Sequence, residues 1–246
     1  MHSAPEKAAT DTVAAIIIAW NEADALRLIL PELPAALIDE LIVVDGGSTD
    51  GTVEVAASLG ARVVQQPGRG YGDACWAGAR AATADILVFL DGDYADDPAE
   101  FKQVLEPVLV GRADLTVGSR NGPGTEADAL PAHQRFGNGL ACLLIRLLYR
   151  VRMEDIGSFR AIRRETLLAL GMCEMTYGWP VEMVVKASRE GLRIEGVPVR
   201  YRRRIGHSKV GGTLKGSMKA GWLMMAVIVR YAFKRPHRLS SRSSKG

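Results

Sequence analysis

Short apolar runs alternate with segments of helical character over the first half of the chain. The apolar runs are rich in aliphatic and β-branched residues, which is typical of buried strands; they lie at 13–19, 40–44, 61–65, 86–90 and 115–117. The segments between them favour helices, at 21–30, 52–59, a small-residue stretch ending at 82, and 98–110. Asn21 is the expected N-cap of the first helix. This alternation predicts an α/β fold with a doubly wound, mostly parallel sheet.

The pattern changes after Arg120. A polar linker leads to a leucine-rich helix at 137–152, which carries three arginines, and short mixed segments follow. The segment 216–231 is apolar in the middle and bounded by lysine and arginine, so it can lie in a membrane interface. It could instead be a core helix or an oligomer contact. We interpret the second half as an extension that completes the site of the first.

Composition excludes several classes of protein. Of the 246 residues, 48% are hydrophobic and 24% are charged, as in globular proteins. The longest apolar stretch, 220–229, is well short of the roughly 20 residues that span a bilayer. The first 12 residues are polar, so no secretory signal is visible. The 3 cysteines are too scattered for a disulfide framework or a metal knuckle. We therefore expect a cytoplasmic protein.

Charge is distributed unevenly along the chain. From Gly196 to the end there are 13 lysine and arginine residues and no acidic ones, so the preceding 195 residues hold 18 basic and 28 acidic residues. A basic end on an acidic body suggests a polyanionic partner, such as a phospholipid surface or a phosphorylated substrate. Nucleic acid is not expected as a partner, because the basic stretch contains no recognisable reading module.

Carboxylates follow two of the predicted strands, where parallel α/β sheets bind ligands. Asp91 and Asp93 flank one glycine directly after the strand at 86–90, and together they can face a divalent cation such as magnesium or manganese. A solvated turn is the alternative. Asp45 ends the strand at 40–44 in the same way and could accept a hydrogen bond from a ribose or a base. No serine, cysteine or histidine stands in a nucleophile motif.

Three motifs of the first half resemble those of the family 2 glycosyltransferases. They are Trp20-Asn21-Glu22, the segment 43–52 (VVDGGSTDGT) and Asp91-Gly92-Asp93, in matching order and spacing. Later segments are similar to the dolichyl- or polyprenyl-phosphate sugar synthases of that family, namely 118–120 (GSR), 155–160 (DIGSFR), 177–183 (YGWPVEM) and 204–209 (RIGHSK). The resemblance covers residues 13–215 and implies a fold of the glycosyltransferase A type.

The resemblance also implies an inverting, metal-dependent hexosyltransferase with a nucleotide-diphosphate-sugar donor of the GDP-mannose or UDP-glucose type. Its implied binding residues fall into three groups. The nucleoside would be bound by Trp20, Glu22 and Asp45, with Asp73 as a further candidate. The cation, magnesium or manganese, would be coordinated by Asp91 and Asp93. The phosphates of donor and acceptor would be contacted by Arg120, Arg204 and Lys209, which with Asp93 are the expected catalytic residues.

Two departures from the family pattern concern the donor side. Trp20 replaces the usual tyrosine of the first motif and keeps an aromatic face for the base. Ala95 stands where the lipid-phosphate branch can have a glutamine that helps to coordinate the metal, so a water or Asp96 would have to substitute.

Three hypotheses about function remain, and the first two differ in the acceptor. A polyprenyl or dolichyl phosphate at an anionic membrane surface needs no general base, because its second pKa near ~6 leaves it charged at neutral pH. A soluble hydroxyl acceptor would need a base, for which Asp155 and Glu182 are the candidates, although both could simply orient sugar hydroxyls. The third hypothesis is a non-catalytic nucleotide-binding protein that docks on membranes.

The favoured hypothesis divides the chain into five parts. Residues 1–12 and 236–246 would be disordered tails, and 13–120 the nucleotide-sugar-binding core. Residues 121–213 would be the acceptor-side half of the same catalytic domain, and 214–235 an amphipathic helix in the membrane interface. This organisation would place the enzyme at the inner face of the cell membrane.

Overall fold

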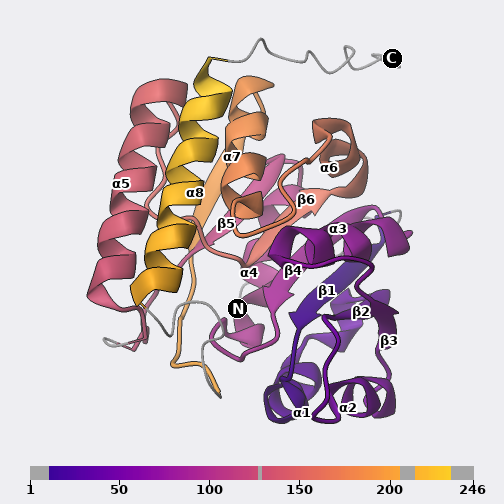
Figure 1. The fold of residues 1–246 in the computed structure, drawn as a ribbon. Coiled ribbons are helices and arrows are strands. Elements are labelled where there is room, and N and C mark those ends of the chain that lie inside the picture. Colours follow the sequence, from indigo (N-terminus) through magenta and orange to yellow (C-terminus); the bar gives the residue numbers. More distant parts are fainter. Residues whose placement is uncertain (1–10, 127–128, 206–213, 234–246) are drawn as a thin grey trace, which may run out of the picture.

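A mixed sheet runs through the computed structural model, which describes residues 11–126, 129–205 and 214–233 (Figure 1). Within these residues the sheet has seven strands in the order β3-β2-β1-β4-β6-β5-β7. Their bounds are β1 Val13–Ala19, β2 Glu40–Asp45, β3 Arg62–Gln65, β4 Ile86–Asp91, β5 Leu115–Ser119, β6 Arg160–Arg163 and β7 Ile194–Pro198. β6 runs antiparallel to both β4 and β5, and the other strands are parallel to one another. The α/β fold with a mostly parallel sheet is thus confirmed.

The strand register brings the sequence motifs to one edge of the sheet. Ala19 at the end of β1 pairs with Asp45 at the end of β2. On the other side of β1, Ile18 pairs with Asp91 at the end of β4. The loops after these three strands therefore begin side by side.

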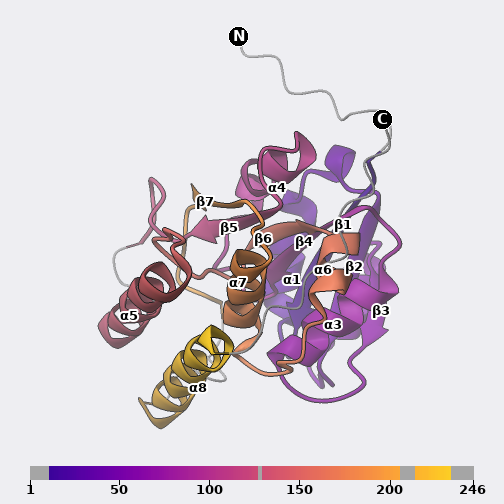
Figure 2. The same ribbon diagram turned by 90° about the horizontal axis from the view of Figure 1, so that it is seen from above.

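Helices cover both faces of the sheet (Figure 2). One face packs against α1 Ala23–Glu32, α2 Thr52–Ser58 and α4 Phe101–Leu109. The other packs against α3 Tyr71–Ala81, α5 Ala132–Tyr149, α6 Arg164–Leu170, α7 Trp179–Arg189 and α8 Leu214–Ala232. Two short 3-10 helices, Ala35–Leu37 and Pro98–Glu100, lie in the connections. Because β1 is covered on both sides, all seven of its residues are apolar.

The helices differ from the sequence-based predictions at their ends. α1 begins at Ala23 and not at Asn21, because Asn21 adopts a left-handed φ of 53° and its side chain accepts a hydrogen bond from Thr49 N. Asn21 is therefore not the N-cap. α5 begins at Ala132, five residues earlier than predicted, and ends before Arg150, whose φ is 59°.

The second half supplies strands that the sequence pattern did not resolve. β6 lies between β4 and β5, and β7 extends the sheet beyond β5. α5 and α8 contact each other along the outside of the molecule, and α8 also contacts α7 (Figure 1). None of the described helices combines the length and the apolar character that crossing a bilayer requires.

Close packing of α3 on the sheet gives a test of the fold. A Cβ at Gly78 would lie 2.5 Å from Ile16 Cγ2, whereas one at Gly139 in α5 would meet nothing within 4 Å. Gly78→Ala should lower the free energy of unfolding by about 1–3 kcal/mol through overpacking. Gly139→Ala should raise it by up to about 1 kcal/mol through helix propensity. Urea titrations of both variants would measure this, and equal stability would contradict the packing.

Candidate active site

Hydrogen bonds join the loop after β1 to the loop after β2. The backbone N–H of Asn21 donates to Ser48 Oγ at 2.8 Å, and that of Glu22 donates to Thr52 Oγ1 at 2.9 Å. The Asn21 side chain accepts from Thr49 N at 2.8 Å. Glu22 is thereby held at the edge of the sheet, with only 8% of its surface exposed.

Three other predicted donor-side residues lie around these loops. Asp45 is buried, and its carboxylate accepts from the N–H groups of Gly47 and Ser48, which fixes the turn after β2. Trp20 is half exposed. Asp73, in the first turn of α3, accepts from Gly68 N at 2.8 Å and so holds the glycine-rich loop before that helix.

Asp91 and Asp93 lie where β4 ends. The glycine between them is required by close packing, because a Cβ at Gly92 would lie 2.8 Å from Ile18 O. Oδ1 of Asp91 is buried and has no hydrogen-bond partner among the described residues. Burial, and secondarily the charge of Asp93, raises the pKa of Asp91 to about 6. Asp93 accepts from Ala95 N at 3.0 Å.

Arg204 pairs with one carboxylate from each of two loops, Asp93 after β4 and Glu22 after β1. Its Nη2 lies 3.1 Å from Asp93 Oδ2 and 3.3 Å from Glu22 Oε1. The backbone around it is fixed by hydrogen bonds from Arg202 N to Ala95 O and from Ile205 N to Asp93 O. The basic segment 200–205 therefore ends against the loop that carries Asp91 and Asp93.

Buried Asp97 anchors the same basic segment. Its carboxylate is within 2.7 Å of Arg202 Nη2 and 3.1 Å of Arg200 Nη1. The guanidinium of Arg202 also lies over the ring of Tyr94, 4.6 Å from its centroid. Thus Arg200 and Arg202 hold the segment in place, while Arg204 reaches the site.

Arg120 and Asp155 form a bidentate pair beside the aspartates. Arg120 Nε and Nη2 donate to the two carboxylate oxygens at 2.7 and 2.6 Å, and Arg120 N adds a third hydrogen bond. Burial alone would raise the pKa of Asp155, but its hydrogen bonds and the charge of Arg120 outweigh burial and lower it. The guanidinium of Arg120 lies 5.3 Å from the centroid of Tyr201.

Asp96 is a third carboxylate of the site. It is buried and accepts from Ser158 Oγ at 3.0 Å, and its backbone pairs with Tyr201 in an antiparallel bridge. Burial, together with the charges of Asp91 and Asp93, raises its pKa to about 8. From the sequence, Asp96 was expected only as a substitute metal ligand, and Ser158 and Tyr201 were not among the predicted site residues.

Glu182 lies away from this group. It is fully buried in α7, where it accepts from the N–H groups of Cys173 and Glu174 and from Tyr231 Oη of α8 at 2.5 Å. Lys186 Nζ lies 3.1 Å from the same carboxylate. The structure therefore brings together Glu22, Asp91, Asp93, Arg120, Asp155 and Arg204, but not Glu182. Lys209 lies outside the described residues.

The residues present fit a cation that is shared with a ligand. Among the described residues no group of three or more histidine, cysteine or acidic side chains could hold a metal ion alone. Asp91 nevertheless offers a buried oxygen without a partner, and the guanidinium of Arg204 already neutralises Asp93. Magnesium commonly takes one or two carboxylates, with water and substrate phosphates as its other ligands.

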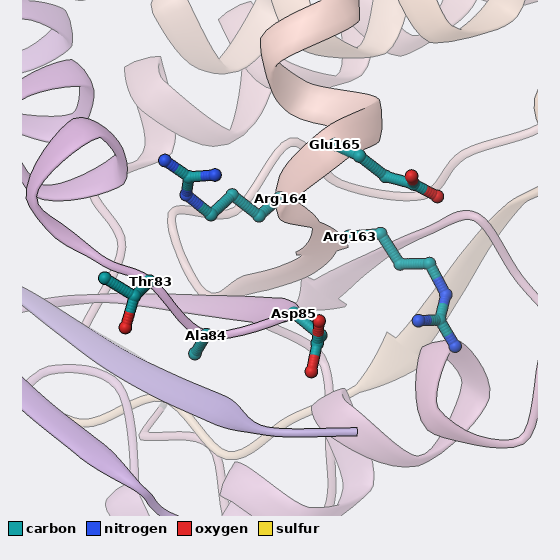
Figure 3. Close-up of a pocket in the computed structure, with 6 residues that line it drawn as sticks. All are labelled: Thr83, Ala84, Asp85, Arg163, Arg164 and Glu165. Atoms are coloured by element: carbon teal, nitrogen blue, oxygen red, sulfur yellow. The ribbon is translucent and has the colours of Figure 1, made fainter. Parts of the chain in front are cut away.

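A hollow at the opposite end of the sheet is not part of this group. Thr83, Asp85 and Arg163 are among its lining residues (Figure 3). Arg163 is paired with Asp11, and Asp85 accepts from Thr12. Arg163 and Asp85 thus have partners within the chain, whereas Nε of Arg164, another lining residue, is buried without a hydrogen-bond partner among the described residues.

Known proteins share both the motifs and the fold. The model of glycosyl transferase family 2 matches residues 14–171. An uncharacterised glycosyltransferase of Mycobacterium tuberculosis is 36% identical over 213 residues, which are 86% of this chain and 95% of that protein. The undecaprenyl-phosphate mannosyltransferase of Micrococcus luteus is 32% identical over 219 residues, covering 83% of this chain and 89% of the relative.

A solved structure extends the comparison to the fold. Glucosyl-3-phosphoglycerate synthase from Mycobacterium tuberculosis, in complex with Mn²⁺, UDP and glucosyl-3-phosphoglycerate, superposes with a TM-score of 0.72 at 24% identity, covering 91% of this chain and 81% of that one. The fold is therefore of the glycosyltransferase A type. With the family model and the relatives, it follows that the chain belongs to glycosyl transferase family 2 and is a glycosyltransferase.

The buried pair of Arg120 and Asp155 makes stability depend on pH. Because the pKa of Asp155 is lowered on folding, its contribution is present above the ordinary value of about 3.9 and is lost as the pH falls below it. Asp155→Ala should cost about 3–5 kcal/mol at pH 7, since it leaves a buried guanidinium unpaired. Unfolding titrations should show this difference shrinking towards pH 3.

Asp114→Ala is the matched control for this experiment. Asp114 also pairs with an arginine, Arg193, which is exposed to solvent. Asp114→Ala should therefore lower the free energy of unfolding far less than Asp155→Ala. A cost for Asp155→Ala that equals the control, or that does not change with pH, would contradict the assigned pair.

Proposed function

We propose that this enzyme transfers a hexose, with inversion, from a nucleotide-diphosphate sugar to a polyprenyl phosphate at a membrane surface. The observation that carries the proposal is the convergence of Asp91, Asp93, Glu22 and Arg204 at the ends of parallel strands. The name of the Micrococcus luteus relative supports a lipid-phosphate acceptor.

On the donor side, Glu22 and Asp45 would hold the nucleoside, with Trp20 against the base and Asp73 supporting the adjoining loop. Asp91 and Asp93 would hold a divalent cation, which when bound would neutralise the donor diphosphate. The Mn²⁺ and UDP of the structural neighbour support this assignment. Arg204, and Lys209 beyond the described residues, would contact the phosphates that carry the developing charge.

On the acceptor side, the geometry favours a nucleophile that needs no general base. The Asp155 carboxylate is occupied by Arg120, and Glu182 is buried among its own donors. A phosphate monoester is already charged at neutral pH, since its second pKa is near ~6. Arg120 would help to hold that phosphate, and catalysis would then come from positioning and charge neutralisation.

The outer surface of α5 and α8 fits a lipid environment. Large apolar side chains are exposed along both helices and directly after α8; this α5–α8 face consists of Phe136, Leu140, Leu143, Leu147, Leu148, Trp222, Val229 and Phe233. Neither helix contains an acidic residue, and Arg135, Arg146 and Arg230 on them are exposed. Apolar side chains among basic ones suit the interface of an anionic membrane.

A small soluble acceptor is the second candidate. The structural neighbour was solved with glucosyl-3-phosphoglycerate, a soluble product. A hollow of about 550 Å³ beside the end of β5, with Ser119, Arg146 and Arg152 among its lining residues, would suit a small anion. If the nucleophile were a hydroxyl group, a general base would be needed, and both sequence-predicted candidates, Asp155 and Glu182, are held by donors of their own.

The cation assignment predicts the effect of two substitutions. Asp91→Asn and Asp93→Asn should each reduce transfer at least about 100-fold, because charge on the departing diphosphate is no longer neutralised. The assay follows labelled sugar from a panel of nucleotide sugars into polyprenyl phosphate with Mn²⁺ present. Asp85→Asn, at the opposite end of β4, should retain activity. Normal transfer by both site variants would remove the assignment.

The α5–α8 face predicts membrane attachment. The double variant Leu143→Glu/Leu147→Glu should no longer sediment with phosphatidylglycerol vesicles, whereas the wild type should. Leu59→Glu is the matched control, because Leu59 is similarly exposed at the end of α2 on the other layer. Wild-type protein that stays in the supernatant would count against the lipid surface and in favour of a soluble acceptor.

A further inference from the structure

The hydroxyl of Tyr71, the first residue of α3, is buried beside the carboxylate of Asp91. Neither this hydroxyl nor Oδ1 of Asp91 has a hydrogen-bond partner among the described residues. Geometry places them on the same face of the sheet, because Tyr71 and Phe89, which lies two residues before Asp91 in β4, both meet the ring of Trp179 edge to face, with centroids 6.5 and 5.2 Å away. After burial itself, the charge of Asp91 raises the pKa of Tyr71, and the hydroxyl opposes the rise at Asp91. Buried polar groups without partners are costly, so such a pair needs an explanation.

Close packing fixes the backbone at the start of α3. Gly70 has a φ of 108°, and a Cβ there would lie 2.5 Å from Met175 O. A Cβ at Gly72 would collide with Glu174 O. Asp73 N donates to Met175 O at 3.0 Å. Glycine is therefore required on both sides of Tyr71, and the loop before α7 holds the tyrosine in place.

The ring of Tyr71 is held as firmly as its backbone. It meets the fully buried Trp179 edge to face, with centroids 6.5 Å apart. The guanidinium of buried Arg160 lies 5.9 Å from the centroid of Trp179 and donates to Pro180 O at 3.0 Å and to Gly157 O. With ring and backbone both fixed, the hydroxyl is kept beside Asp91.

We propose that Tyr71 is a positioning residue that donates a hydrogen bond to Asp91 and fixes this carboxylate for a divalent cation. The inference rests on the proposed cation site. Groups that hydrogen-bond to metal ligands orient them, and their loss commonly weakens metal affinity 10–100-fold. It also gives a purpose to Gly70 and Gly72, the glycines on either side of Tyr71.

The test is Tyr71→Phe in the full chain, which removes the hydroxyl and keeps the ring. Binding of Mn²⁺ is titrated by the loss of its free-ion electron paramagnetic resonance signal, with saturating UDP and, separately, GDP. The variant should bind Mn²⁺ about 10-fold or more weakly than the wild type. Nucleotide affinity without metal should stay the same, because the substitution keeps the ring and leaves the proposed nucleoside-binding residues unchanged.

Tyr149→Phe is the matched control. The variant loses a part-buried hydrogen bond, from the Tyr149 hydroxyl to Ile228 O at 2.5 Å, which lies between α5 and α8. Its Mn²⁺ affinity should equal that of the wild type. Thermal unfolding confirms that each variant is folded.

The outcomes separate this inference from the proposed function. Equal Mn²⁺ affinity in the wild type and in Tyr71→Phe would overturn the role of Tyr71 and leave the cation site intact. A wild type that binds no Mn²⁺ with either nucleotide would overturn both. An equal loss in Tyr71→Phe and Tyr149→Phe would show a general effect of stability and would also reject the positioning role.

Discussion

The parallel pairing of β1 with β2 and β4 is the constraint on which the site depends. These strands are apolar on both faces, so their register depends on how side chains of different size pack against the helices on each side. That register places Asp45 opposite Ala19 and Asp91 opposite Ile18. The carboxylates thus converge because the core is packed, and not because they attract one another.

Carboxylates gathered in this way repel, and arginines from the second half of the chain compensate. Arg204 neutralises Glu22 and Asp93, while Asp97 binds Arg200 and Arg202. These ion pairs therefore join the acidic first part of the chain to its basic C-terminal part. A strand from the second half, β6, lies inside the sheet beside β4, so the two halves share one core.

Local signals explain which parts could be predicted from the sequence. β1 stands out as a wholly apolar run, and β4 with the Asp91-Gly92-Asp93 turn stands out because its apolar run ends abruptly in carboxylates. Asp96 and Tyr201 were not paired in advance, because only the folded chain brings their backbones together. The burial of Glu182 was equally hidden, since its partner Tyr231 lies 49 residues further along the chain. Long-range pairing, and not local pattern, decided these cases.

A crystal structure of the wild type with Mn²⁺ and a nucleoside diphosphate, with anomalous scattering recorded for manganese, would test the central claim most directly. We expect an anomalous peak between Asp91 and Asp93, with the diphosphate on the same ion and Arg204 beside the phosphates. A nucleotide bound elsewhere, or a complex without manganese in which Arg204 still holds Asp93, would contradict it.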